Sequence, residues 1–170
     1  LLGRLFAGQE DYDSRLSYGT PFQFPATGRW HGGELRLLST AMANHKWMLG
    51  LELQDNTVIR QAILDVETPA NDIVISGSGS RAGLYAQDEW RFAESWIATL
   101  GVRVDHNDTT GTNTSPRAAL IWQAAPATTL KALYGRAHRA PNAYERDYDD
   151  GFAQVANPAL GGESITTLEL

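Results

Sequence analysis

Apolar and polar residues alternate with a period of two along much of the chain, and no stretch shows the 3.6-residue period of a helix. The clearest example is residues 47–53, where Trp or Leu occupies every second position and Met, Gly and Glu lie between them. Residues 96–104 and 117–123 alternate in the same way. Successive side chains of a β-strand point to opposite faces, so this pattern predicts strands with one apolar and one more polar face.

The alternation predicts an all-β protein: an antiparallel up-and-down meander of about eight strands with little helix. The expected strands are residues 1–12, 28–42, 45–62, 80–92, 95–107, 115–124, 128–138 and 163–170. All seven prolines fall between these ranges or at a strand start, which supports the boundaries because proline cannot donate to a sheet ladder. Asp88 interrupts the pattern, since it falls on the apolar face of its strand.

The gaps between the expected strands alternate in length. Short turns are expected near residues 43–44, 93–94 and 125–127, and long loops near residues 13–27, 63–79, 106–114 and 139–162. Short turns on one side and long loops on the other are typical of a transmembrane β-barrel of the outer membrane.

The tryptophans follow the same asymmetry. Four of the five lie within a few residues of a short turn, and Trp30 is the exception; the four are Trp47, Trp90, Trp96 and Trp122. In a meander they form a belt at one end of the sheet, as indoles do at a membrane–water interface. A core layer at one end of a soluble barrel is the alternative explanation.

Composition limits the class of protein. The chain has 42% hydrophobic and 20% charged residues and a mean hydropathy of −0.32, which suits a barrel with a polar lumen or a soluble β protein. No apolar run approaches the ~18 residues of a membrane-spanning helix. Cysteine is absent, which excludes disulfides and thiolate metal sites. The net charge of −6 argues against nucleic acid as a partner.

The two ends of the chain do not look like the ends of a protein. Residues 1–4 include no Met and begin no signal peptide, and residues 166–170 stop within a strand-like pattern. We therefore expect an internal fragment of a longer chain.

Several segments resemble TonB-dependent outer-membrane receptors. Residues 83–90 (GLYAQDEW) and 100–105 (LGVRVD) resemble the strands on either side of a periplasmic turn, and residues 115–122 (SPRAALIW) resemble a strand opening of that family. The most specific match is residues 129–145 (TLKALYGRAHRAPNAYE), followed by residues 157–160 (NPAL) and 163–169 (ESITTLE).

This resemblance implies that residues 1–170 are part of a β-barrel domain of the 22-strand kind in the outer membrane of a Gram-negative bacterium. Receptors of this family take up siderophores, haem or cobalamin with energy supplied through TonB, and a ferric siderophore is the ligand we favour. The implied partners are outer-membrane lipid, a plug domain and TonB, and the plug and the TonB-contacting segment lie upstream of this chain. His138 stands where the family often has Phe, and no His lies in residues 142–156, which lowers the expectation of haem.

No residues point to catalysis, so we expect a receptor rather than an enzyme, with no catalytic residue, metal or cofactor. The four histidines are scattered without metal-pair spacing, and His45 is expected to be a solvated turn residue. One acidic cluster is a candidate for a hard cation such as calcium, with a solvated loop as the simpler explanation; it comprises Glu145, Asp147, Asp149 and Asp150.

The candidate ligand-binding residues lie on or near the last long loop. They are Arg139, Tyr144, Arg146 and Tyr148. Arginine and aromatic side chains suit an anionic, aromatic ligand such as a catecholate siderophore, although ordinary loop composition would also explain them. A further set is expected to face the lumen, where it could hydrogen-bond the plug: Glu52, Gln54, Asn56, Arg103 and Lys131.

Three other functions fit parts of the pattern. They are a small outer-membrane barrel with a structural or adhesive role, an outer-membrane hydrolase barrel, and a soluble β-barrel that binds small apolar ligands. For the hydrolase we find no Ser–His constellation. If the chain is a fragment, its first and last strands expose unpaired backbone groups, so we also expect it to self-associate.

Overall fold

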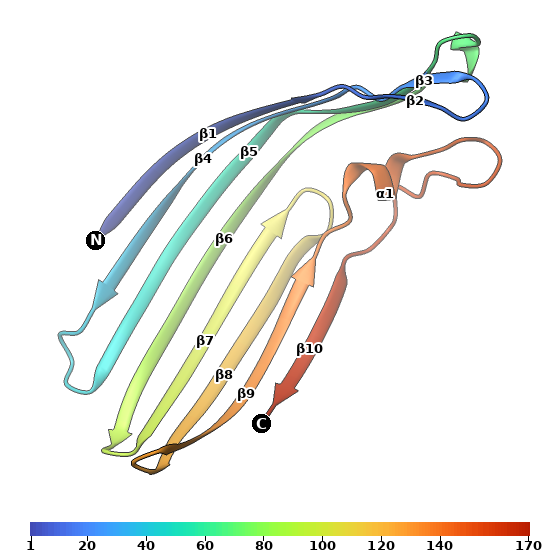
Figure 1. Ribbon diagram of the computed structural model, residues 1–170. Helices are drawn as coiled ribbons and strands as arrows, with labels where there is room; N and C mark the ends of the chain where they lie inside the picture. The colour runs from blue at the N-terminus through green and yellow to red at the C-terminus, as the bar shows by residue number, and fades with distance from the viewer.

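All residues from 1 to 170 are described by the computed structural model, in which they form a curved sheet (Figure 1). Its principal strands are β1 (Leu2–Tyr12), β4 (Ala26–Ser39), β5 (His45–Asp65), β6 (Ile73–Ala93), β7 (Trp96–Asn107), β8 (Gly111–Ala125), β9 (Thr128–Arg139) and β10 (Glu163–Glu169). They pair in the order β1-β4-β5-β6-β7-β8-β9-β10, and every pairing is antiparallel. The expected up-and-down meander is confirmed.

Short elements fill the connections at one end of the sheet. Strands β2 (Arg15–Ser17) and β3 (Pro21–Gln23) form a hairpin that pairs with the last residues of β5. A 3-10 turn, η1 (Pro69–Asn71), joins β5 to β6, and a short helix, α1 (Ala143–Asp147), follows β9. No helix is long and apolar enough to cross a bilayer.

Several expected boundaries are wrong. Strand β6 begins at Ile73 rather than near residue 80, because Gly- and Ser-rich residues 76–80 pair with β5 although such residues have low strand propensity. The long loop expected at residues 106–114 is a tight turn, in which the Asn107 side-chain oxygen accepts hydrogen bonds from the amides of Thr109 and Thr110. Cross-strand pairing and side-chain hydrogen bonds, which the alternation does not encode, set these limits.

Pro116 lies inside β8, not at its start as expected. Strand β8 pairs with β7 along residues 111–122 but with β9 only from Arg117 onward. Pro116 therefore occupies a stretch of β8 that has a partner on one side only, and proline is tolerated at such an edge.

The two faces of the sheet differ as the alternation predicts. Leu49, Leu51 and Leu53 share the outer face of β5 and are between 41% and 51% exposed. The other, concave face carries polar side chains, including Glu52, Gln54 and Arg103, which hydrogen-bond with one another or with neighbours. Only five of the 170 residues are buried. The sheet is thus a single layer without a core of its own.

The aromatic belt forms at the short-turn end. Figure 1 places the β4–β5, β6–β7 and β8–β9 turns at one end and β2, β3, η1 and α1 at the other. Trp96 stacks on Trp122 with ring centroids 5.1 Å apart, and Phe92 links Trp96 to Trp90 at 6.0 and 5.3 Å. The expected clustering of these tryptophans is confirmed.

His45 is not the solvated turn residue that we expected. It is the first residue of β5, its ring stacks on Trp90 at 5.5 Å, and its Nδ1 lies 2.7 Å from a carboxylate oxygen of Asp88. Asp88, which the alternation left unexplained, is therefore held on the apolar face by a specific partner.

The sheet does not close. β1 pairs only with β4 and β10 only with β9, so each leaves one free edge. Figure 1 shows the two termini on opposite sides of a trough. A closed barrel, which all three alternatives require, is not formed by these residues.

Candidate ligand-binding hollow at the long-loop end

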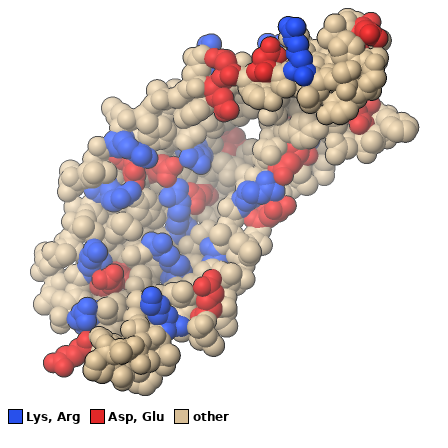
Figure 2. All heavy atoms as spheres, in the orientation of Figure 1, with Lys and Arg blue, Asp and Glu red and all other residues tan.

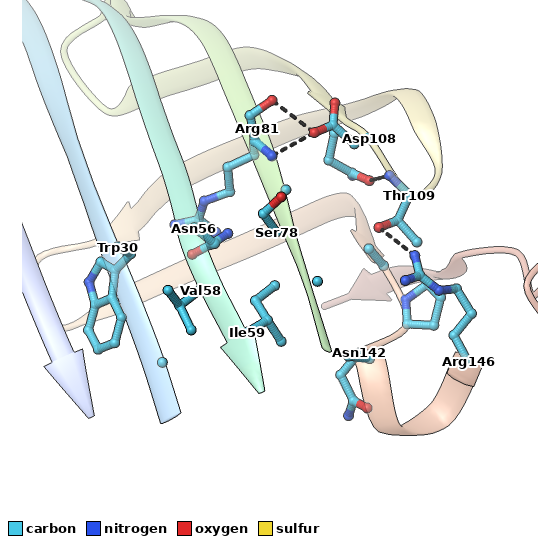
Figure 3. Close-up of a pocket in the computed structure, with 18 of the residues that line it drawn as sticks. Trp30, Asn56, Val58, Ile59, Ser78, Arg81, Asp108, Thr109, Asn142 and Arg146 are labelled. Carbon is cyan, nitrogen blue, oxygen red and sulfur yellow. Dashed lines mark hydrogen bonds between the residues drawn. The ribbon is translucent and has the colours of Figure 1, made fainter. Parts of the chain in front are cut away.

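A hollow of ≈ 840 Å³ lies on the concave face at the end that carries the long loops. Figure 3 shows residues from several strands and from the β9–β10 loop around it, among them Trp30, Asn56, Asp108 and Arg146. Most of its lining is polar or glycine, so it suits a solvated, polar ligand better than an apolar one.

Trp30 reaches the hollow because the neighbouring strand offers no side chain opposite it. Gly8 on β1 pairs with Trp30 on β4, and a Cβ at Gly8 would lie 2.3 Å from the Trp30 ring. The indole therefore lies across the glycine. Trp30 is thus an aromatic wall of the hollow, well separated along the sheet from the belt of the other four tryptophans.

The β7–β8 turn is fixed to its neighbours by hydrogen bonds. The Asp108 carboxylate accepts from the Ser80 amide at 2.7 Å and from the Ser80 hydroxyl at 3.0 Å. The amide hydrogen bond, more than any other contact, holds the pKa of Asp108 below its ordinary value. On the same turn the Thr109 hydroxyl accepts from Arg146 at 3.3 Å, which connects α1 to the wall (Figure 3).

Helix α1 begins with a reciprocal cap. The Asn142 side chain accepts from the Glu145 amide at 2.8 Å, and the Glu145 carboxylate accepts from the Asn142 amide at 2.9 Å. Arg139 also donates to Glu145 at 2.8 Å, and this contact is the main reason why the pKa of Glu145 is lowered. One turn of helix is thereby positioned over the end of β9.

The four candidate ligand residues are close in sequence but do not share one surface. Arg146 lines the hollow and forms an ion pair with Asp147 at 2.7 Å, which lowers the pKa of the Asp147 carboxyl. Arg139 does not line the hollow and lies between Glu145 and Glu163, 3.1 Å from the latter.

Tyr144 and Tyr148 form an aromatic pair, and each follows a residue that lines the hollow, Ala143 or Asp147. Their ring centroids are 4.6 Å apart and the planes are inclined by 28°. Tyr144 is exposed, whereas Tyr148 is half-buried, and this burial raises the pKa of its phenol. The pair therefore offers one accessible aromatic ring, that of Tyr144.

The acidic cluster organises its own loop. The amides of Phe152, Ala153 and Gln154 donate to one Asp150 oxygen at 2.7 to 2.9 Å, and these hydrogen bonds lower the pKa of Asp150. Asp149 accepts from the amide of Gly151 at 2.8 Å. No group of three or more such side chains comes together in a way that could hold a metal ion.

The concave face below the hollow carries a connected set of charges. Arg103 lies 2.7 Å from Asp105 and 3.2 Å from Glu52, and Arg81 lies 3.2 Å from the same glutamate. Basic and acidic side chains lie side by side over the hollowed face in Figure 2. The expected orientation of Glu52, Gln54, Asn56 and Arg103 is confirmed. Lys131 lies on the same face, because it pairs with Ile121, and Ile121 and Arg117 share the concave face of β8.

Sequence reasoning missed most of the wall of the hollow. Trp30, Arg81 and Asp108 come from three different parts of the chain, and no local motif links them. For Trp30 a signal was available, because it is the one tryptophan far from a short turn.

A family model described as "TonB dependent receptor-like, beta-barrel" matches residues 3–170. The chain belongs to this family. The charged concave face, the apolar outer face and the sorted loops are thus features of a TonB-dependent receptor barrel, and the resemblance expected from residues 81–170 is confirmed over nearly the whole chain.

Three relatives match parts of the chain, and they include an outer membrane protein, a receptor and a transporter. The chain is 33% identical over 91 residues to the iron-regulated outer membrane virulence protein of Vibrio cholerae, which covers 51% of this chain and 14% of that protein. It is 36% identical over 74 residues to the ferric enterobactin receptor of Pseudomonas aeruginosa, with 44% and 10% covered. It is 36% identical over 67 residues to the vitamin B12 transporter of V. cholerae, with 39% and 10% covered.

The fold agrees with a solved structure. The siderophore receptor PirA from P. aeruginosa superimposes with a TM-score of 0.62 at 20% identity, over 98% of this chain and 35% of that one. The chain thus spans about a third of that receptor's length. At this identity the likeness shows the fold alone.

Proposed function

We propose that this chain forms part of the barrel of an outer-membrane receptor that takes up a ferric siderophore with energy from TonB. The observation that carries the proposal is that the two ends of the sheet carry different features. An aromatic belt marks the short-turn end, and a polar hollow of ≈ 840 Å³ opens among the long loops at the other. In outer-membrane barrels the long loops face the outside, where a scarce ligand arrives.

The chemistry around the hollow supports an anionic ligand with aromatic groups. Arg81 and Arg146 line the hollow, and Trp30 contributes an indole to its wall. Tyr144 is exposed and directly follows Ala143, which lines the hollow. Guanidinium groups attract anionic oxygens and aromatic rings stack on catechols, so a ferric catecholate satisfies both. The ferric enterobactin receptor among the relatives agrees with this class of ligand.

A plug domain is the partner that we propose for the concave face. This face is charged and is covered by no other part of the chain. Arg117 lies on it and forms no ion pair within the chain, whereas Arg103 and Arg36 each have a carboxylate partner. An acidic group on the plug would neutralise Arg117. TonB would act through a segment of the same receptor outside residues 1–170.

The test uses the complete receptor that carries these residues, purified in detergent. We expect Arg146→Ala and Tyr144→Ala each to weaken binding of a ferric catecholate by about tenfold, as loss of a charged or aromatic contact does at an interface. Binding is measured by quenching of tryptophan fluorescence, and uptake of radioactive iron is compared in cells with and without TonB.

Phe152→Ala is the matched control. Phe152 is 95% exposed on the same loop and takes no part in the tyrosine pair. Its loss should leave binding unchanged. Uptake that does not depend on TonB, or tight binding of cobalamin with no binding of ferric catecholate, would contradict the proposal.

A further inference from the structure

Trp30 lies among glycines on the concave face of the sheet. Across the sheet it pairs with Gly8 of β1 on one side and with Asn56 of β5 on the other. Gly28 lies two residues before it on β4, and alternate residues of a strand share a face. Because a glycine has no side chain, the space above Gly8 and Gly28 is free for the indole.

The indole lies down over this space. A Cβ at Gly8 would lie 2.3 to 2.8 Å from Cζ2, Cε2 and Nε1 of Trp30, on one edge of the ring system. A Cβ at Gly28 would lie 3.5 Å from Cζ3 and 3.9 Å from Cε3, on the opposite edge. The ring therefore spans the two glycines. One of its faces lies toward the backbone and the other toward the hollow, and Trp30 is accordingly half-buried.

Cations line the hollow away from this indole. Arg81 of β6 and Arg146 of α1 both contribute to the lining, and Figure 3 shows Trp30 and Arg146 on opposite sides of the hollow. A volume of ≈ 840 Å³ leaves room for a small ligand between them. A flat indole on one side and guanidinium groups on the other match the two parts of a ferric catecholate, which are planar rings and anionic oxygens.

We infer that Trp30 is a stacking platform that selects ligands with a planar aromatic ring, and that Gly8 is the positioning residue that keeps the indole flat. The inference rests on the proposed function and narrows it, because it assigns the choice of ferric catecholates over ferric hydroxamates to one indole. Hydroxamate groups also chelate iron through oxygen, but they present no ring that could stack. A side chain in place of Gly8 would tilt the indole into the hollow and remove the flat face.

Ligand binding by the complete receptor in detergent tests the platform. Equilibrium dialysis with radioactive iron measures it without relying on tryptophan fluorescence. With the iron(III) complex of a hexadentate tris-catechol, we expect Trp30→Leu to weaken binding about tenfold, as loss of one stacked ring does. Trp30→Phe should retain most of the affinity because it keeps a ring. With the iron(III) complex of a hexadentate tris-hydroxamate, wild-type binding should be weaker and Trp30→Leu should leave it unchanged.

A double-mutant cycle tests the role of Gly8. Gly8→Ala should weaken catecholate binding although Trp30 is retained, and it should add no further loss in a Trp30→Leu receptor, because it acts only through the indole. Gly3→Ala is the matched control on the same strand. A Cβ at Gly3 would lie 3.9 Å from Leu35, an ordinary contact, and Gly3 does not line the hollow. Urea unfolding compares the two alanine variants, and the Trp30 variants decide the question if Gly8→Ala proves less stable than Gly3→Ala.

Unchanged catecholate binding by Trp30→Leu would overturn the inference, and so would an equal loss for the catecholate and hydroxamate complexes. A Trp30→Phe receptor no better than Trp30→Leu would show that the ring does not stack. Losses that simply add in the double-mutant cycle would remove Gly8 from its positioning role. A wild-type receptor that binds the catecholate as tightly as Trp30→Leu does would refute the platform and leave the proposed function standing, whereas a wild-type receptor that binds no ferric catecholate would refute the proposed function itself.

Discussion

At the scale of single residues, short polar side chains fix the backbone of the long-loop end. Asp65, at the end of β5, accepts hydrogen bonds from the amides of Glu67 and Thr68 at 3.0 and 2.9 Å, and Asn107 and Asp150 bind nearby amides in the same way. The alternation of apolar and polar residues marks these positions only as gaps. Which amide each polar side chain binds depends on local backbone angles, so the tight turn after β7 and helix α1 could not be predicted from that pattern.

Replacement of Asp65 should loosen the β5–β6 connection. Asp65 is 7% exposed, and its amide hydrogen bond with Thr68 is the main cause of its lowered pKa. In Asp65→Ala we expect the amides of Glu67 and Thr68 to exchange with solvent much faster than in the wild type, measured by hydrogen–deuterium exchange. Glu67→Ala is the control, because the Glu67 side chain is exposed and the acceptor for both amides is Asp65.

The same contact gives the connection a dependence on pH. Because the pKa of Asp65 is lower in the folded protein than its ordinary value of 3.8, the carboxylate stabilises the turn fully above that value. The stabilisation is lost as the pH falls through the folded pKa. Exchange at these two amides, corrected for its intrinsic pH dependence, should stay constant from neutral pH to about pH 5. Protection that falls already between pH 7 and pH 5 would contradict this account.

At the scale of the elements, aromatic side chains cover glycines on neighbouring strands. Tyr85 of β6 pairs with Gly50 of β5, and a Cβ at Gly50 would lie 2.1 Å from the tyrosine ring. The Tyr85 hydroxyl donates to Glu34 on β4 at 2.9 Å, so the ring bridges three strands. The existence of the strands was predictable because period-two alternation repeats in each of them. The packing of aromatic rings over glycines was not predictable, because it depends on which residues of neighbouring strands pair.

A side chain at Gly50 should therefore destabilise the barrel. Gly50→Val would displace Tyr85 from its place and break its hydrogen bond with Glu34, and overpacking of this kind costs about 1–3 kcal/mol. The measurement is urea unfolding of the complete receptor in detergent, followed by tryptophan fluorescence. Gly77→Val is the matched control, since no atom lies within 4 Å of a Cβ there. Equal loss of stability in both variants would show that strand propensity, rather than packing against Tyr85, sets the effect.

The fluorescence of single tryptophans should distinguish the two ends of the sheet and its two faces. Trp96 and Trp122 lie in the belt, whereas Trp30 lines the polar hollow. In receptors that retain one tryptophan of this chain at a time, nitroxide-labelled lipids should quench Trp96 and Trp122 strongly when the label is near the headgroup. Trp30 should respond to iodide in water and little to the lipids. Strong lipid quenching of Trp30 would place it on the wrong face of the sheet.

At the scale of the whole molecule, the sheet depends on surroundings that the chain does not supply. Its strand order follows from sequence, because each short turn or loop joins neighbours in an up-and-down meander. The hollow does not follow from the sequence, because Trp30, Arg81 and Asp108 come together only when the sheet curves. Curvature comes from the bulges and twist that accumulate over many strands, such as the register shift between Asn56 and Ile59. The sequence pattern identifies the faces of strands but not how far they bend toward one another.

The 170-residue chain by itself should not remain a stable monomer in water. Its two outer strands, β1 and β10, each present one edge without ladder partners, which is a template for pairing with another chain. Its apolar face is uncovered as well: Leu100 is 63% exposed and Leu84 is also 63% exposed. Each such leucine forgoes about 1.5–3 kcal/mol that burial would provide.

We therefore expect the purified chain to associate through its edges and apolar face when detergent is removed, and light scattering in detergent-free buffer measures this. Detergent above its micelle concentration should reduce the particle size, because it covers the apolar face, while the strand edges remain free to pair. A monodisperse monomer in buffer would contradict this expectation. It would require β1 to pair with β10 and the leucines of the outer face to be turned inward, and a one-residue shift of register reverses the faces of a strand. The resulting closed barrel would have an apolar interior, as a soluble carrier of small ligands has.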